Sequence, residues 1–97
     1  MAIYKNITGE LTQELLSGNS EQSYSSISLC NIASSSCKVD LYIERKLTGK
    51  FYIIKDLFLH VGEVPVINII REEGFGLYIK LTKSGAGVNP EVDIIIR

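Results

Sequence analysis

Tryptophan is absent from this sequence, and several other residue types with distinctive chemistry are scarce. The 97 residues include two Cys, two Pro, one His and one Met. Because Cys30, Cys37 and His60 are the only thiol and imidazole side chains, a zinc site of four Cys and His ligands cannot be assembled. The lack of Trp argues against a module that binds its ligand on a concave aromatic patch.

Charge of one sign is nowhere in excess. Ten basic and eleven acidic side chains give a formal charge of -1, and no stretch is a Lys/Arg run. Proteins that neutralise a nucleic-acid backbone need a basic face. We therefore expect no nucleic-acid partner and no function that depends on one.

Long apolar runs are also missing. The longest, Val64 to Ile70 and Ile94 to Ile96, fall far short of a membrane span. Residues 1 to 6 lack the charged and apolar segments of a secretory signal. We therefore expect no membrane partner, folding in a cytoplasm, and thiols that stay reduced.

Aliphatic residues are abundant by contrast. The hydrophobic fraction is 45%, and Ile is the commonest residue. A chain of this length forms one domain, residues 1 to 97, which can bury only somewhat more than about 60% of its unfolded surface. Either its sheet is packed on both faces, or other chains cover part of it.

Short segments of alternating apolar and polar residues recur along the chain. Strands are expected at residues 2–7 and 11–17, from Tyr24, around Leu41, at 51–55 and, after a bend, at 56–61, and at 64–70, 75–81 and 92–97. Residues 10–16 also fit one helical turn, but Gly9 and Gly18 bracket them and so short a helix is marginal in water. About eight short strands with regular turn signals predict an all-β fold, an antiparallel β-sandwich or jelly roll.

The stretch from Ser26 to Gly62 is predicted to organise the fold. Its three β-rich runs and two short connections describe an antiparallel meander in the middle of a sheet. If the first connection turns tightly about Ala33 and Ser34, Cys30 lies opposite Cys37. Residues 51–55 are apolar on both faces, so that strand should lie centrally or under a partner.

Two other strands leave apolar side chains without a place in the core. In the closing strand, Ile94 and Ile96 share a face with Val92, so Ile95 points the other way. The strand after Pro65 raises the same difficulty, and Pro65 itself favours an edge. We predict an interface with other chains that consists of Val66, Ile69, Ile70 and Ile95.

Catalytic constellations are not evident. Cys30 or Cys37 with His60 would still need an orienting group and an oxyanion site, so we interpret the cysteines as strand residues and the histidine as structural. Glu72 and Glu73 adjoin a glycine turn and should point to opposite faces. We predict no catalytic, cofactor-binding or metal-binding residues and no enzymatic activity.

Two weaker motifs have simpler interpretations. Residues 6–8 match a glycosylation acceptor, which without a secretory signal is a chance match. The glycine pairs at 74–76 and 85–87 lack the following helix of a phosphate-binding loop and are predicted to be turns.

The order of features resembles the small β-sandwich virion proteins of tailed bacteriophages, which include capsid decoration proteins and neck or tail components. The matching segments are Ile27-Ser-Leu-Cys-Asn31, a Ser-rich turn, Val39-Asp-Leu-Tyr-Ile43, a Gly turn, Tyr52-Ile-Ile-Lys-Asp56, an apolar segment to Gly62, the β-branched residues 64–69, and Val92-Asp-Ile-Ile-Ile96. Residues 1–20 are not part of the match. His60 stands where such proteins often carry a Pro before the turn.

The resemblance implies a non-enzymatic virion structural protein, made in the host cytoplasm. A capsid decoration (cement) protein that stabilises the shell is the first hypothesis, with a major capsid or other virion protein as partner. It also implies a homo-oligomer, for which a trimer is the expected form. A neck or tail subunit is the alternative within this class, and a ligand-binding β-sandwich module is the alternative outside it. A more distant one is a small cytosolic enzyme that uses Cys30 or Cys37.

Overall fold

The computed structural model describes residues 2–19, 23–69, 71–72, 74–85 and 87–97. Every strand pairing within its two sheets is antiparallel, and the described residues include no helix. The predicted all-β fold class is therefore confirmed. Eight strands are present: β1 (Ile3–Thr8), β2 (Thr12–Leu16), β3 (Ser26–Asn31), β4 (Cys37–Arg45), β5 (Gly49–Leu59), β6 (Val66–Asn68), β7 (Gly76–Lys83) and β8 (Glu91–Ile96).

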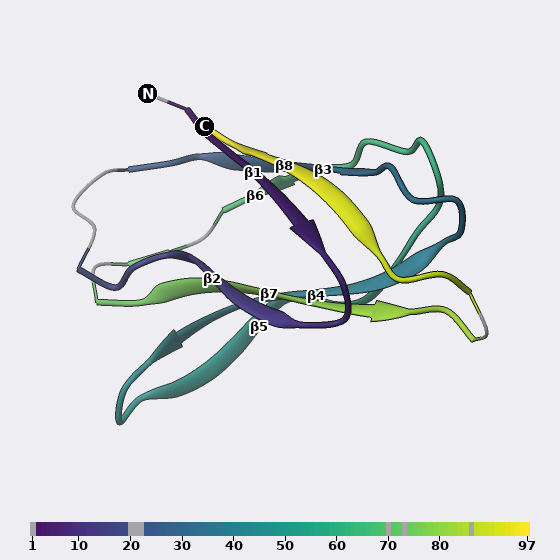
Figure 1. Cartoon of the computed structure of the whole chain (residues 1–97). Coiled ribbons are helices and arrows are strands. Elements are labelled where there is room, and N and C mark those ends of the chain that lie inside the picture. The colour runs from purple at the N-terminus through teal and green to yellow at the C-terminus, as the bar shows by residue number, and fades with distance from the viewer. Residues whose placement is uncertain (1, 20–22, 70, 73, 86) are drawn as a thin grey trace.

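The strands form two four-stranded sheets that pack face to face (Figure 1). Sheet A has the order β1-β8-β3-β6, and sheet B has the order β2-β7-β4-β5. Every connection except the β4–β5 hairpin passes from one sheet to the other. This order is that of a jelly roll, an arrangement that brings the first and last strands together as neighbours in one sheet.

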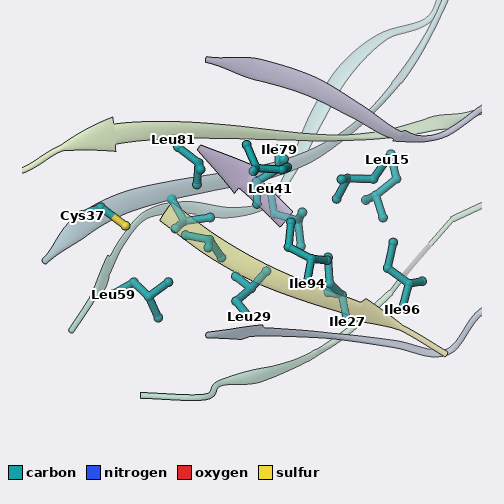
Figure 2. Close-up of a cluster of buried hydrophobic side chains, with 14 of the residues drawn as sticks. Leu15, Ile27, Leu29, Cys37, Leu41, Leu59, Ile79, Leu81, Ile94 and Ile96 are labelled. Atoms are coloured by element: carbon teal, nitrogen blue, oxygen red, sulfur yellow. The ribbon is translucent and has the colours of Figure 1, made fainter. Parts of the chain in front are cut away.

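The core lies between the sheets and is almost wholly aliphatic. Strand alternation directs every second side chain inward, and Figure 2 shows these side chains from both sheets pointing toward one another. In β8 the inward residues are Val92, Ile94 and Ile96, all buried, as their alternation predicts. Burial of each such side chain contributes roughly 1.5 to 3 kcal/mol.

One buried polar side chain, Asn31, fixes a crossing between the sheets. Its amide nitrogen donates to the carbonyl oxygens of Ser35 at 2.9 Å and Leu59 at 3.0 Å, and its amide oxygen accepts from the Ala33 N–H at 2.9 Å. Its backbone oxygen accepts from the Gly62 N–H at 3.0 Å. Asn31 thus joins the end of β3 to the loop that enters β4 and to the end of β5.

This crossing makes two predictions wrong. Residues 26–62 do not form a three-stranded meander, because β3 belongs to sheet A while β4 and β5 belong to sheet B. Cys30 therefore does not face Cys37: Cys30 lies opposite Asp93 of β8, and Cys37 lies opposite Leu59 and Lys83. Residues 32–36 carry the chain across the sandwich instead of turning it back on itself.

Of the two positions expected for residues 51–55, the central position in a sheet is wrong, and cover by a partner stays a prediction. They belong to β5, which pairs only with β4 and forms an edge of sheet B. The predicted bend near residue 56 is present, since Asp56 has φ 55° and its N–H donates to the Asp40 carboxylate at 2.7 Å. The predicted edge position after Pro65 is confirmed by β6.

Candidate interaction surfaces

The two cysteines occupy different environments. Both are strand residues, as expected, and both are free thiols. Cys37 is fully buried in the core, and this burial raises the pKa of its thiol. Cys30 is half-buried on the outer side of β3. A buried thiol with a raised pKa is a poor nucleophile at neutral pH, because little of it is thiolate.

His60 lies at the surface beyond the end of β5. Its ring packs edge-on against Phe58 with centroids 4.7 Å apart, its Nδ1 is 3.4 Å from the Ser36 hydroxyl, and its Nε2 is 3.8 Å from the Glu63 carboxylate. These contacts stabilise the turn that follows β5. Within the described ranges, no group of three or more His, Cys, Asp or Glu side chains is arranged to hold a metal ion.

The remaining motif residues also lie at the surface. Glu72 is exposed in the turn before β7, where its carbonyl oxygen accepts from the Phe75 N–H, while Glu73 lies outside the described residues. Asn6 of the glycosylation pattern projects from β1, and its amide donates to Asp93 at 2.8 Å and Glu91 at 3.3 Å. Gly74 and Gly85 adopt positive φ, at 91° and 59°, as turn residues do.

On the outer face of sheet A, one row of side chains crosses all four strands and is apolar on three of them. The register places Tyr4 of β1, Ile95 of β8, Ser28 of β3 and Val66 of β6 side by side. Tyr4 is 73% exposed and Val66 is 67% exposed, whereas Ile95 is half-buried between them. Two shallow depressions flank Ile95, and the one on the β6 side also includes Val64.

This face brings together two of the four predicted interface residues. Ile95 and Val66 share the outward side, as the alternation predicts. Ile69 does not: it is partly buried against the core, and its N–H donates to the Ser25 carbonyl oxygen, so its place in an interface stays a prediction. Ile70 lies outside the described residues. The exposed tyrosine on β1 was missed, because pairing of β1 with β8 links opposite ends of the sequence.

The outer face of sheet B carries an aromatic row instead. Glu14, Tyr78, Tyr42 and Tyr52 lie opposite one another on β2, β7, β4 and β5. The rings of Tyr78 and Tyr42 stack with centroids 5.4 Å apart and planes 9° apart, and Tyr52 meets Tyr42 edge-on at 5.5 Å. The Lys50 ammonium lies 4.5 Å from the centroid of the Tyr42 ring.

The environment of this row shifts two pKa values upward. A hydrogen bond of 3.0 Å from the Tyr78 hydroxyl to Glu14, with some burial, raises the pKa of Tyr78. Burial raises the pKa of Tyr42, although the charge of Lys50 acts in the opposite direction. Tyr42 is only 6% exposed, because the neighbouring rings and Lys50 cover its faces. A ring whose faces are already covered cannot serve as a stacking platform for a ligand.

The β4–β5 hairpin projects from sheet B as an arm, defined here as residues 44–52 (Figure 1). All nine residues are exposed, and Leu47 at the tip is 101% exposed with φ 72°. Residues with a large apolar side chain rarely adopt the left-handed backbone conformation, which is more common for glycine and asparagine. Farther along the arm, Phe51 is 52% exposed although its ring meets Phe75 at 6.1 Å.

The sheet edges carry features that disfavour pairing with another strand. β6 is only three residues long and follows Pro65. β5 has two register shifts, one beside Asp56, and β2 has one. On β1, Lys5 lies opposite the buried Ile94 and therefore places a charge on the inward side of the edge. Bulges, short edges and inward charges are devices that prevent edge-to-edge association. These edges are therefore less suited to contacts with another chain than the faces and the arm are.

None of the described residues belongs to a helix long and apolar enough to cross a membrane. Comparisons with protein-family models, with curated proteins and with solved structures each find no match.

Proposed function

We propose that this chain is a non-enzymatic structural protein of a bacteriophage virion, and that it serves as a capsid decoration protein. The observation that carries the proposal is the apolar row of Tyr4, Ile95 and Val66 on the outer face of sheet A. Its exposed members belong to a domain whose core is already complete. Contiguous exposed apolar surface of this kind usually marks a contact with another protein.

Two further lines support the proposal. The order of segments from Ile27 to Ile96 resembles small virion proteins of tailed phages. The jelly-roll strand order occurs in viral capsid proteins, although it also occurs in lectins and cupins, so it serves only as an analogy. The lectin-like alternative is less favoured, because the faces of Tyr42 are covered by Tyr78, Tyr52 and Lys50.

A decoration role makes a specific demand on the row. Each copy must be held on the particle through a small area, by the shell or by a neighbouring copy, and the same contact is repeated over many copies. Ile95 is the centre of the row, with Tyr4 on one side and Ser28 on the other. Because Ile95 is already half-buried, covering it contributes about half of the roughly 1.5 to 3 kcal/mol that a fully exposed Ile would give. Tyr4 and Val66, which are more exposed, add to this contribution in every copy.

Immunogold labelling of particles purified from the producing culture tests the proposal. We expect gold over the shell at many positions. Gold confined to the neck or tail would favour the alternative virion role. Particles that carry no gold, and in which mass spectrometry does not detect the chain, would refute both roles. In a complementation assay, Ile95→Lys should fold normally but be depleted from particles. Thr12→Lys, on the outer face of sheet B, is the matched control and should incorporate normally.

A further inference from the structure

The arm and the β1–β8 end of sheet A are complementary surfaces on one chain. The arm contains Arg45, Lys46 and Lys50 against the single carboxylate of Glu44, a net charge of +2 in a chain of net charge -1. The outer face at β8 contains the two carboxylates of Glu91 and Asp93. Each surface also has an exposed large hydrophobic residue, Leu47 at the tip of the arm and Tyr4 on the face.

These two surfaces cannot meet within one copy. The arm extends sheet B, whereas the acidic surface is on the side of sheet A that faces away from sheet B. Contact between them therefore requires two molecules. The arm and the acidic surface also belong to strands that do not pair with one another.

We propose that the arm of one copy docks on the outer β1–β8 face of another copy, with Leu47 in the depression beside Ile95. That depression is lined by Tyr4, Lys5, Asn6, Asp93, Ile94 and Ile95. The proposal deepens the proposed function and rests on it in one respect: a particle subunit needs a contact that can repeat between copies. The partner that the exposed arm contacts is then a second copy of this chain.

Charge complementarity links the tip of the arm to the face. Lys46 adjoins Leu47 at the tip, and Asp93 lines the depression that Leu47 would enter. At the base of the arm, Lys50 lies opposite Glu44 and offsets its charge. Lys46 and Asp93 are therefore the charge pair expected across the contact.

The contact is heterologous, because it joins different surfaces on the two copies. Such a contact closes into a ring when the rotation between copies allows, and otherwise propagates as a filament. The left-handed conformation of Leu47 suits this arrangement, because it holds an apolar side chain at the most exposed point of the hairpin. Residues in such conformations often mark functional positions. Docking would also bring Phe51 near the partner and cover part of its exposed ring.

Charge exchange in the purified full-length protein tests the docking. Lys46→Glu and Asp93→Lys should each weaken self-association, measured by sedimentation equilibrium, by roughly tenfold or more. The double variant Lys46→Glu/Asp93→Lys should restore the association to near its original strength. Lys38→Glu, an exposed lysine at the far end of β4, is the control and should have little effect. Equal weakening by the control, or a double variant as weak as either single one, would overturn the proposal.

Cross-linking identifies the surfaces directly, whatever the strength of association. Leu47→Cys and Tyr4→Cys are made separately with Cys30→Ser, mixed at high concentration and treated with a short bismaleimide. We expect a heterodimer linked between positions 47 and 4. Links only between two copies of the Tyr4→Cys variant would show face-to-face association. Links no more frequent than those of a Val88→Cys control would show that the arm does not dock. Either result overturns the proposal. Particles that contain the chain despite such a result would leave the proposed function standing.

Discussion

Tyr42 and Tyr78 stack in parallel across β4 and β7, with ring centroids 5.4 Å apart. The pair joins two central strands of sheet B, and Tyr52 and Lys50 close the other side of Tyr42. A residue on an outer sheet face is thus nearly as buried as a core residue. Its role is to hold the sheet together, independent of any ligand.

Tyr42→Ala should therefore destabilise the protein as a core truncation does. We expect the free energy of unfolding to fall by about 2 to 3 kcal/mol, somewhat less than for large aromatic truncations in a core, because one side of the row is open to solvent. Urea denaturation followed by circular dichroism measures the change. Phe58→Ala, at an exposed aromatic on the neighbouring strand, should cost clearly less. Equal costs at the two positions would show that the stacking contributes nothing.

The Tyr78 hydroxyl gives the fold a dependence on alkaline pH. Its hydrogen bond to Glu14 raises its pKa above the ordinary value of 10.0, so the folded state holds this proton more tightly than the unfolded state does. The resulting stability is complete below about pH 10 and is lost as the pH rises through the folded-state pKa. Tyr78→Phe should abolish this decrease in stability at alkaline pH, and it should lower the free energy of unfolding at neutral pH by about 0.5 to 1 kcal/mol.

Unfolding free energies at pH 7 and at several values above pH 10 provide the measurement. The difference between Tyr78→Phe and the original chain should shrink as the pH rises. Tyr4→Phe, at an exposed tyrosine on the other sheet, controls for the titration of unrelated groups. A difference that stays constant with pH would exclude the proposed linkage.

Asn31 is expected to be one of the most sensitive polar positions. Asn31→Ala leaves the carbonyl oxygens of Ser35 and Leu59 and the N–H of Ala33 without their partner. We expect a loss of about 2 to 4 kcal/mol, because buried groups left unsatisfied carry the full desolvation cost. Asn6→Ala removes three exposed hydrogen bonds on the outer face and should cost about 0.5 kcal/mol. Thermal or urea unfolding that ranks the two variants the other way would contradict this role.

The two thiols should differ in reactivity in the native protein. Cys37 is fully buried, and burial raises its pKa, so iodoacetamide should modify Cys30 long before Cys37. Cys37→Ser should cost about 1 to 3 kcal/mol and Cys30→Ser less than about 0.5 kcal/mol. Peptide mass spectrometry after timed alkylation gives the rates. Rapid labelling of Cys37, or an unfolded double Ser variant, would show that this interpretation is wrong.

Local properties of the fold could be predicted from the sequence, because strand alternation is set by neighbouring residues. The outward position of Ile95, the edge position after Pro65 and the bend near Asp56 are examples. Each depends only on side chains or backbone preferences within a few residues. The fold class followed from the same local evidence.

Strand partnership could not be predicted in this way. Nothing near Cys30 signals that the chain crosses to the other sheet after Asn31, because the amide bonds that fix the crossing reach Leu59, 28 residues away. The tyrosine row likewise requires the registers of β2, β7, β4 and β5 together. Alternation alone directs Tyr42 and Tyr78 outward, but it does not reveal that their rings stack. The arm was missed because residues 51–55 look like a central strand until β5 is known to be an edge.

A cryo-electron microscopy reconstruction of the intact particle tests the central claim most directly. The account predicts density for this eight-stranded sandwich at regularly repeated positions on the shell, with the row of Tyr4, Ile95 and Val66 covered by protein. A reconstruction with no such density, from particles in a culture that produces the chain, would contradict the claim. So would density in which the outer face of sheet A is exposed to solvent in every copy.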